Sequence, residues 1–260
     1  MISHRGIATL CPDEALMSSQ ASHIHPRILV VIPALNEAEN IGRVVSRIKR
    51  DAPDVDVAVI NDGSTDATGR IAAACGAIVL NLPYNVGIGA AVQTGLRYAL
   101  EHAYEIVVRS DGDGQHTSEY IDLLITTLLN EQADLVVGSR FLQQGGSTSF
   151  TRRVGIIILA NMISLIIGQR ITDPTSGFVA FSRRALTLCA HNFPHDYPEP
   201  ESLVLLHRAG LRIREVPVTM HPREGGQSSI TALSSIYYMF KVILAILISL
   251  LRPAPVVDAG

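Results

Sequence analysis

The segment Glu105-Ile-Val-Val-Arg-Ser-Asp-Gly-Asp-Gly-Gln-His-Thr-Ser118 places two aspartates, Asp111 and Asp113, shortly after an apolar run. The run at 106–108 is typical of a strand that is buried on both faces of a parallel sheet. A glycine follows each aspartate, so we expect the chain to turn where the strand ends. Open α/β sheets bind their ligands at the carboxyl ends of the strands. The segment therefore predicts a fold class and the position of a site.

On both sides of this segment, strand-like and helix-like patterns alternate through short connections. Apolar runs typical of strands lie at 28–32, 55–60, 77–80, 135–137 and 211–218. Helical periodicity lies between them, opening at Asn36 and continuing to 48, then at 71–74, 87–101 and 120–129. This alternation predicts an α/β fold with a mainly parallel central sheet that is flanked by helices.

The composition excludes some classes of protein. The chain has 260 residues, a formal net charge of −3 and a pI near 6.3, which argues against a general nucleic-acid binder. Its three cysteines lack metal-binding spacing and indicate a reducing compartment. Residues 1–26 contain no signal peptide and are expected to be a flexible extension. Residues 27–229 would form the main domain, and residues 230–260 an apolar helix and tail.

Two apolar segments, 154–168 and 230–251, contribute to a mean hydropathy of +0.27. Neither is a convincing membrane span, because the first falls short of the roughly 20 residues needed and the second contains Lys241. Arg152, Arg153 and Arg252 flank the segments where anionic head groups would lie. We therefore expect amphipathic helices that lie on a membrane surface. The alternative is that both are buried core helices.

Carboxylates at two expected strand ends suggest a ligand site. Asp111 and Asp113 can reach one ion from a tight turn, and Gln115 adds a neutral oxygen. Hard oxygen ligands suit Mg²⁺ or Mn²⁺, which in turn bind phosphate oxygens. Surface turns contain many such aspartate pairs, but the place of this pair after a buried strand favours a metal site. Asp62 can accept a hydrogen bond from a base or a ribose hydroxyl; alternatively, Asp62 or Ser64 caps the next helix.

Several short motifs follow one another in a fixed order. Five of them together resemble the family 2 glycosyltransferases of the GT-A fold: Ile32-Pro-Ala-Leu-Asn-Glu37, Ile60-Asn-Asp-Gly-Ser-Thr65, Asn85-Val-Gly-Ile-Gly89, Asp111-Gly-Asp-Gly-Gln-His116 and Gly138-Ser-Arg140. Three more resemble the branch that contains dolichol-phosphate mannose synthase and polyprenyl-phosphate glycosyltransferases: Asp173-Pro-Thr-Ser-Gly-Phe178, Glu215-Val-Pro-Val218 and Arg223-Glu-Gly-Gly-Gln-Ser228. The resemblance spans about residues 27–229.

The resemblance implies roles for individual residues and Mg²⁺ or Mn²⁺ as the cofactor. It implies a metal site of Asp111, Asp113 and Gln115. It implies nucleotide contacts at Pro33, Asn36, Glu37, Asp62, Gly87 and Asp111. The implied catalytic residues are Asp113, Arg140 and Arg223. The implied acceptor contacts are Arg152, Arg153 and Ser228.

The chain departs from the family pattern in two places. The family commonly has Ser-Lys where this chain has Ser228-Ser229, which removes one positive charge from the acceptor site. The usual C-terminal pair of transmembrane helices is replaced by the single segment 230–251. This resembles a subset of enzymes that is thought to work beside a small separate membrane protein. Pairing of the helix with a second copy of the chain is the alternative.

The resemblance implies an inverting transfer of a sugar from a nucleotide sugar to a polyprenyl (undecaprenyl or dolichyl) phosphate, on the cytoplasmic face of the cell membrane. Such an acceptor is already an anion and needs no general base. One alternative is a transferase, such as a rhamnosyltransferase, that extends a lipid-linked or cell-wall glycan, with Glu199 and Glu201 as candidate bases. Otherwise, these two glutamates form the acidic first turn of a helix. A further hypothesis is a non-catalytic membrane-bound module.

Overall fold

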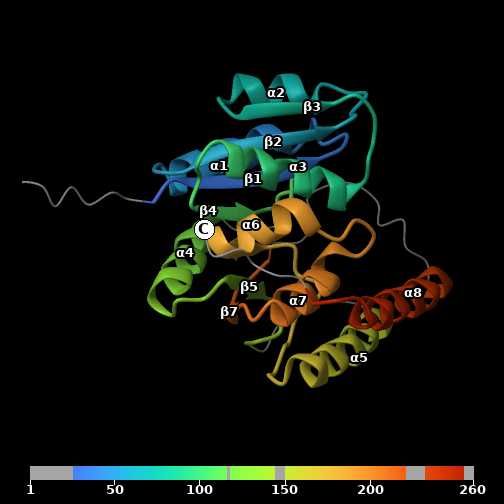
Figure 1. Ribbon diagram of the computed structural model, residues 1–260. Helices are drawn as coiled ribbons and strands as arrows, with labels where there is room; N and C mark the ends of the chain where they lie inside the picture. Colours follow the sequence, from blue (N-terminus) through green and yellow to red (C-terminus); the bar gives the residue numbers. More distant parts are fainter. Residues whose placement is uncertain (1–25, 116–117, 144–149, 221–231, 255–260) are drawn as a thin grey trace, which may run out of the picture.

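The computed structural model describes residues 26–115, 118–143, 150–220 and 232–254 of the chain. In this part of the chain one seven-stranded sheet has the order β3-β2-β1-β4-β6-β5-β7 (Figure 1). β6 runs antiparallel to β4 and β5, and all other neighbours are parallel, which confirms the predicted sheet. The strands are β1 (Ile28–Ala34), β2 (Asp56–Asp62), β3 (Ile78–Leu82), β4 (Ile106–Arg109), β5 (Leu135–Ser139), β6 (Val179–Phe181) and β7 (Ile213–Pro217).

Helices pack on both faces of the sheet, and β1 shows why its sequence is apolar throughout. Leu29 and Val31 belong to one hydrophobic cluster, and Val30 and Ile32 belong to the cluster on the opposite face. All four side chains are fully buried, so neither face of the strand tolerates a polar residue. The first cluster includes residues of α3 (Ile88–Glu101), α6 (Arg183–Asn192) and α7 (Pro198–Arg208), and the second includes residues of α1 (Ile41–Asp51), α2 (Thr68–Ala74) and α4 (Ile121–Asn130).

The two long apolar helices, α5 (Phe150–Ile167) and α8 (Ala232–Leu251), pack against each other and against α7 (Figure 1). Each buries one face in the first cluster, through residues such as Leu159 of α5 and Val242 of α8. The opposite faces expose apolar side chains: Val154, Ile157, Ile158 and Leu165 on α5, and Phe240, Leu244, Leu247, Ile248 and Leu251 on α8. Of the helices described here, none is long and apolar enough to cross a bilayer.

Two details differ from the sequence prediction. The first helix begins at Ile41 rather than Asn36, because the chain turns at Asn36, which has a φ of 54°. Between 137 and 211 the apolar pattern predicts neither β6 nor α6, and the structure contains both. A strand of three residues is too short to show periodicity. Its antiparallel direction follows from the turn at 173–178, which returns the chain between β4 and β5.

Candidate active site

The loops that follow β1 and β2 are tied together at the carboxyl edge of the sheet. The Asn36 Oδ1 atom accepts a hydrogen bond from the Thr65 backbone N–H at 2.9 Å, and the Asn36 N–H donates to Ser64 Oγ at 3.0 Å. The Glu37 N–H donates to Thr68 Oγ1 at 2.8 Å. The predicted nucleotide residues Asn36 and Glu37 therefore lie against the β2–α2 turn, and the Asn36 amide helps to fix that turn.

Asp62 holds a third loop at the same edge. Its carboxylate is 4 % exposed and accepts hydrogen bonds from the Val86 N–H at 2.8 Å and the Gly87 N–H at 3.1 Å. The alternative prediction of a helix cap is wrong, since Ala67 stands at the N-cap of α2 without a side-chain cap bond. Asp62 thus links the end of β2 to the loop before α3, and its contact with a nucleotide stays a prediction.

The Asp111–Asp113 turn follows β4 and lies beside the end of β1. Asp113 Oδ1 accepts a hydrogen bond from the Gln115 N–H at 3.0 Å, which fixes a tight turn. A Cβ atom added at Gly112 would lie 3.5 Å from the Pro33 carbonyl oxygen and 3.6 Å from Glu37 Cγ. The structure therefore brings Pro33 and Glu37 next to the turn that carries Asp111 and Asp113, two of the three predicted metal ligands.

The donor set at this turn fits a magnesium or manganese ion. Within the described residues, no three His, Cys, Asp or Glu side chains are grouped as metal ligands. Mg²⁺ needs no such cage, because it is usually bound by one or two carboxylates together with waters and substrate phosphates. The Asp111 side chain is 33 % exposed, so it is open to such an ion from the solvent side.

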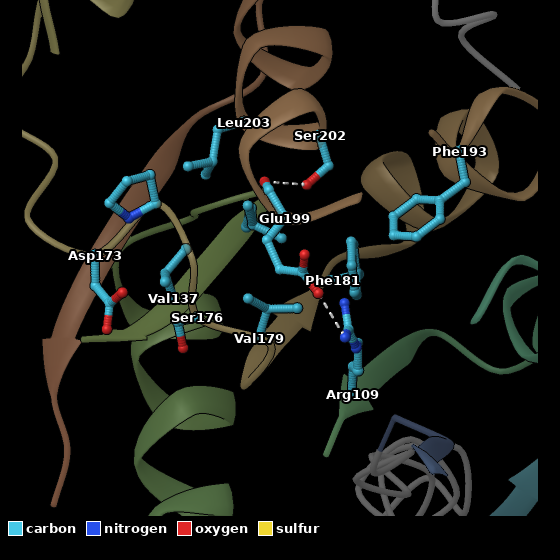
Figure 2. A pocket seen from close by; sticks show the side chains of 12 residues that line it. Arg109, Val137, Asp173, Ser176, Val179, Phe181, Phe193, Glu199, Ser202 and Leu203 are labelled. Carbon is cyan, nitrogen blue, oxygen red and sulfur yellow. Dashed lines mark hydrogen bonds and ion pairs between the residues drawn. The ribbon is translucent and has the colours of Figure 1, made fainter. Parts of the chain in front are cut away.

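Arg109, the last residue of β4, was not among the predicted site residues. It is 2 % exposed, and its Nη2 atom lies 2.7 Å from Glu199 Oε1 and 3.6 Å from Asp111 Oδ1. Figure 2 shows the Arg109 and Glu199 side chains pointing toward each other in the lining of a small internal cavity. Burial opposes the charge on Arg109, but the two carboxylates outweigh this and raise its pKa. The sequence feature that could have pointed to Arg109 is its charge directly after the apolar run at 106–108.

Glu199 and Glu201, the two candidate bases, lie in the first turn of α7 but have different surroundings. Pro198 opens the helix, so the acidic first turn predicted as the alternative is present. Glu199 pairs with Arg109, next to the Asp111 turn. Glu201 faces a different groove, which Arg252 also lines. Burial, and to a lesser degree Asp196, raises the pKa of Glu201. Of the two, the structure brings Glu199 to the predicted metal site.

Arg140 lies at the end of β5 and is bound by a buried carboxylate. Its Nε and Nη2 atoms donate to the two oxygens of Asp173, each at 2.7 Å, and Asp173 is fully buried. Burial opposes the charge on Arg140, but the Asp173 carboxylate outweighs this and raises its pKa. This bidentate pair, which the sequence did not predict, fixes the guanidinium. Its proposed contact with a phosphate stays a prediction.

The predicted acceptor residues are only partly described. Arg153 is exposed on α5 and lines a groove of about 770 Å³ together with Arg170, Asn161 and the apolar side chains of Ile157 and Leu165. The other two predicted acceptor residues, Arg152 and Ser228, and the predicted catalytic residue Arg223 lie outside the described part of the chain, either entirely or in their side chains. The expected extension at 1–26 lies almost entirely outside it as well.

A mainly parallel sheet that gathers an Asp-x-Asp turn and nucleotide-type loops at one carboxyl edge has the arrangement of the GT-A class of sugar-transferring enzymes. A model of the family described as glycosyl transferase family 2 matches residues 29–188, so the chain belongs to this family. The predicted fold, family and enzyme class are confirmed.

Two relatives and one solved structure illustrate the similarity. The polyprenol monophosphomannose synthase of Mycolicibacterium smegmatis is 32 % identical over 227 residues, covering 83 % of this chain and 85 % of that protein. The undecaprenyl-phosphate mannosyltransferase of Micrococcus luteus is 32 % identical over 215 residues, covering 79 % and 88 %. The glucosyl-3-phosphoglycerate synthase of Mycobacterium tuberculosis, in complex with Mn²⁺, UDP and glucosyl-3-phosphoglycerate, superposes with a TM-score of 0.64 at 26 % identity, covering 90 % and 82 %.

Proposed function

We propose that the chain transfers a sugar from a nucleotide-sugar donor to a polyprenyl phosphate on the inner face of the cell membrane. The main observation is the Asp111–Asp113 turn, which lies beside the loops of Asn36 and Asp62 at one edge of the sheet. The names of the two relatives, one a polyprenol monophosphomannose synthase and the other an undecaprenyl-phosphate mannosyltransferase, support the acceptor.

The donor would occupy the edge formed by the three loops. Pro33, Asn36 and Glu37 would face the nucleoside. The hydrogen bonds from the backbone of the 85–87 loop to Asp62 would hold this loop in a position that leaves space for the nucleoside. Asp111 and Asp113, with Gln115, would hold Mg²⁺ or Mn²⁺. When bound, this ion supplies positive charge that stabilises the diphosphate leaving group. The Mn²⁺ and UDP of the similar crystal structure support a metal-dependent donor site.

The acceptor phosphate would be oriented by arginines. A guanidinium group binds phosphate oxygens in a fixed planar geometry, and Arg153 lines the groove beside α5. A lipid phosphate is already an anion near neutral pH, so the attack on the anomeric carbon needs no base. The attack comes from the side opposite the leaving diphosphate and inverts that carbon. The arrangement of Glu199 supports this route, because its Oε1 atom is already bound to Arg109.

The exposed faces of α5 and α8 would rest on the membrane. Each helix buries one side in the core and presents apolar side chains on the other, as interfacial helices do. Arg153 at the start of α5 and Arg252 after α8 would meet anionic head groups. A small membrane subunit or a second copy of the chain would compete for the same apolar surface.

The decisive experiment is donor turnover by the purified chain with Mn²⁺, a panel of nucleotide sugars and a short-chain polyprenyl phosphate. We expect release of nucleoside diphosphate that depends on the lipid and that Asp113→Ala reduces by at least about a hundredfold. Turnover with a glycan acceptor and not with the lipid would favour the glycan-extending alternative. Absence of binding to every donor would favour the non-catalytic module.

A further inference from the structure

The buried guanidinium of Arg109 is costly for the fold. An apolar residue would suit this position, since Ile106, Val107 and Val108 of the same strand are all buried and apolar. Among the described residues, the Arg109 Nε atom has no hydrogen-bond partner. A buried donor without a partner destabilises a fold, and buried ion pairs are often no more stable than apolar pairs of similar volume. Stability alone therefore does not explain Arg109.

Two neighbours limit the space around the Asp111 carboxylate. Arg109 Nη2 lies 3.6 Å from Asp111 Oδ1. At the other carboxylate oxygen, a Cβ atom added at Gly177 would lie 3.1 Å from Asp111 Oδ2, and it would lie 3.0 Å from Arg109 Nη2 as well. The internal cavity beside the guanidinium measures only about 10 Å³, which is too small for a substrate. Arg109 and the 173–178 turn thus restrict the rotation of Asp111.

Glu199 balances the charge that this arrangement introduces. A lone guanidinium next to Asp111 would repel a divalent cation at the same carboxylate. Glu199 Oε1 lies 2.7 Å from Arg109 Nη2, and its side chain is 17 % exposed. The pair is neutral as a whole, so Arg109 can orient Asp111 without adding net positive charge to the metal site.

We propose that Arg109 and Glu199 are positioning residues that hold the Asp111 carboxylate in place for the divalent metal of the donor site. This inference rests on the proposed function. It assigns to Glu199 a role other than that of a general base.

The test is a direct measurement of Mn²⁺ binding in Glu199→Gln, from the electron paramagnetic resonance signal of free Mn²⁺. Binding is measured alone and with whichever of UDP and GDP the wild-type chain binds. Glutamine keeps the shape and a hydrogen bond to Arg109 but leaves its charge unbalanced. We expect the Mn²⁺ dissociation constant to rise about tenfold, which is the size of effect seen when a residue that orients a metal ligand is replaced. At saturating Mn²⁺, kcat should fall by less than about threefold, because a positioning group does not transfer the proton.

A double variant separates positioning from folding. Arg109→Met with Glu199→Met leaves the net charge unchanged and fills the space with apolar atoms. We expect unchanged or higher stability in urea, together with Mn²⁺ binding that is weaker by at least about fivefold. Loss of stability with Mn²⁺ affinity within about twofold of wild type would show that the pair is only structural. If the double variant does not fold, Glu199→Gln alone decides.

Glu131→Gln is the matched control, since it also removes one carboxylate from an ion pair. Glu131 pairs with Arg214 at 2.8 Å, and both are about half exposed, so Mn²⁺ binding should not change. Unaltered Mn²⁺ binding in Glu199→Gln would overturn the inference while the proposed function stands. The inference would also be overturned if Glu199→Gln lowered kcat by about a hundredfold or more at saturating Mn²⁺ while the affinity for Mn²⁺ stayed unchanged. That result would indicate that Glu199 is a general base. Failure of the wild-type chain to bind Mn²⁺ with either nucleotide would overturn both.

Discussion

At the scale of single residues, the site depends on a close approach at Gly177. A Cβ atom added there would lie 3.0 Å from Arg109 Nη2 and 3.1 Å from Asp111 Oδ2, which is tighter than an ordinary contact. Both groups are held by other contacts, so a methyl group at this position would have to displace one of them. A substitution at Gly177 therefore tests whether the orientation of Asp111 matters, and it does so without changing the carboxylates themselves.

For Gly177→Ala, we expect a stability cost of about 1–3 kcal/mol from overpacking and a fall in kcat/KM of at least about tenfold from misplacement of Asp111. The two quantities are measured by urea unfolding and by donor turnover. Gly42→Ala in α1 is the control, because a Cβ there would lie 3.0 Å from Ile71 Cγ2, an equally tight contact at a residue outside the predicted site. Equal kcat/KM in the two variants would contradict the expectation.

Tyr104 gives a prediction for alkaline pH. Its hydroxyl donates to Asp56 Oδ2 at 2.7 Å, and burial, followed by this contact, raises its pKa from 10.0 to about 12. The fold favours the neutral phenol, so its contribution to stability is complete below pH 10 and is lost as the pH rises toward 12. As the pH rises from 10 to 12, we expect the free energy of unfolding of Tyr104→Phe to fall by roughly 1–2 kcal/mol less than that of the wild-type chain. In Tyr104→Phe, the pH titration followed by absorbance at 295 nm should lose the component that titrates at the highest pH. If this component persists, it belongs to another tyrosine.

At the scale of elements, three segments meet behind the active-site edge. Glu215 of β7 accepts hydrogen bonds from the backbone N–H groups of Thr172 and Asp173. Asp173 in turn binds the guanidinium of Arg140 at the end of β5. One ion pair and the hydrogen bonds of one carboxylate therefore fix the start of the 173–178 turn, which contains Gly177 next to Asp111. The position of a predicted metal ligand is thus linked to contacts made several residues away.

A double-mutant cycle on Arg140 and Asp173 tests this linkage. Asp173→Asn leaves the partly buried guanidinium of Arg140 without its counter-charge, and we expect a loss of about 3 kcal/mol in urea unfolding. Arg140→Met should cost a similar amount, and the two losses should not add, because both break the same pair. If Arg140→Met instead left stability unchanged and raised only the KM for donor or acceptor, binding of phosphate would be its main role.

At the scale of the whole molecule, α5 and α8 carry apolar side chains that are 41–86 % exposed. Leu165 is 85 % exposed and Leu251 is 86 % exposed, far more than the core positions on the same helices. An exposed apolar surface of this extent usually marks a contact with a membrane or another protein. The proposal therefore assigns two functional surfaces to the protein: the carboxyl edge of the sheet and this helical surface.

For the double variant Leu165→Asp and Leu251→Asp, we expect binding to vesicles of anionic phospholipid to weaken by at least about tenfold, because both aspartates would enter the interface. Co-sedimentation with the vesicles measures it, and donor binding should be unchanged. Leu129→Asp, at a position that is 51 % exposed on α4, is the control. Equal loss in the control, or no loss in the double variant, would exclude this surface as the membrane contact.

The sequence by itself determined six of the seven described strands of the sheet, the class of the fold and the place of the Asp111–Asp113 turn. These follow from local patterns: a strand buried on both faces must be apolar along its whole length, and a ligand site needs polar residues where such a strand ends. The order of the short motifs indicated the family, and the match of the family model over residues 29–188 confirms it.

Only the tertiary structure decided which side chains meet. Arg109 and Glu199 are separated by 90 positions, Asp62 and Gly87 by 25, and Arg140 and Asp173 by 33. Their contacts depend on the strand order, in which the antiparallel β6 lies between β4 and β5 and brings the 173–178 turn over Asp111. Periodicity reports how each segment is buried but not which segment covers it. The turn that carries the candidate metal ligands could therefore be predicted, whereas the neighbours that pack around it could not.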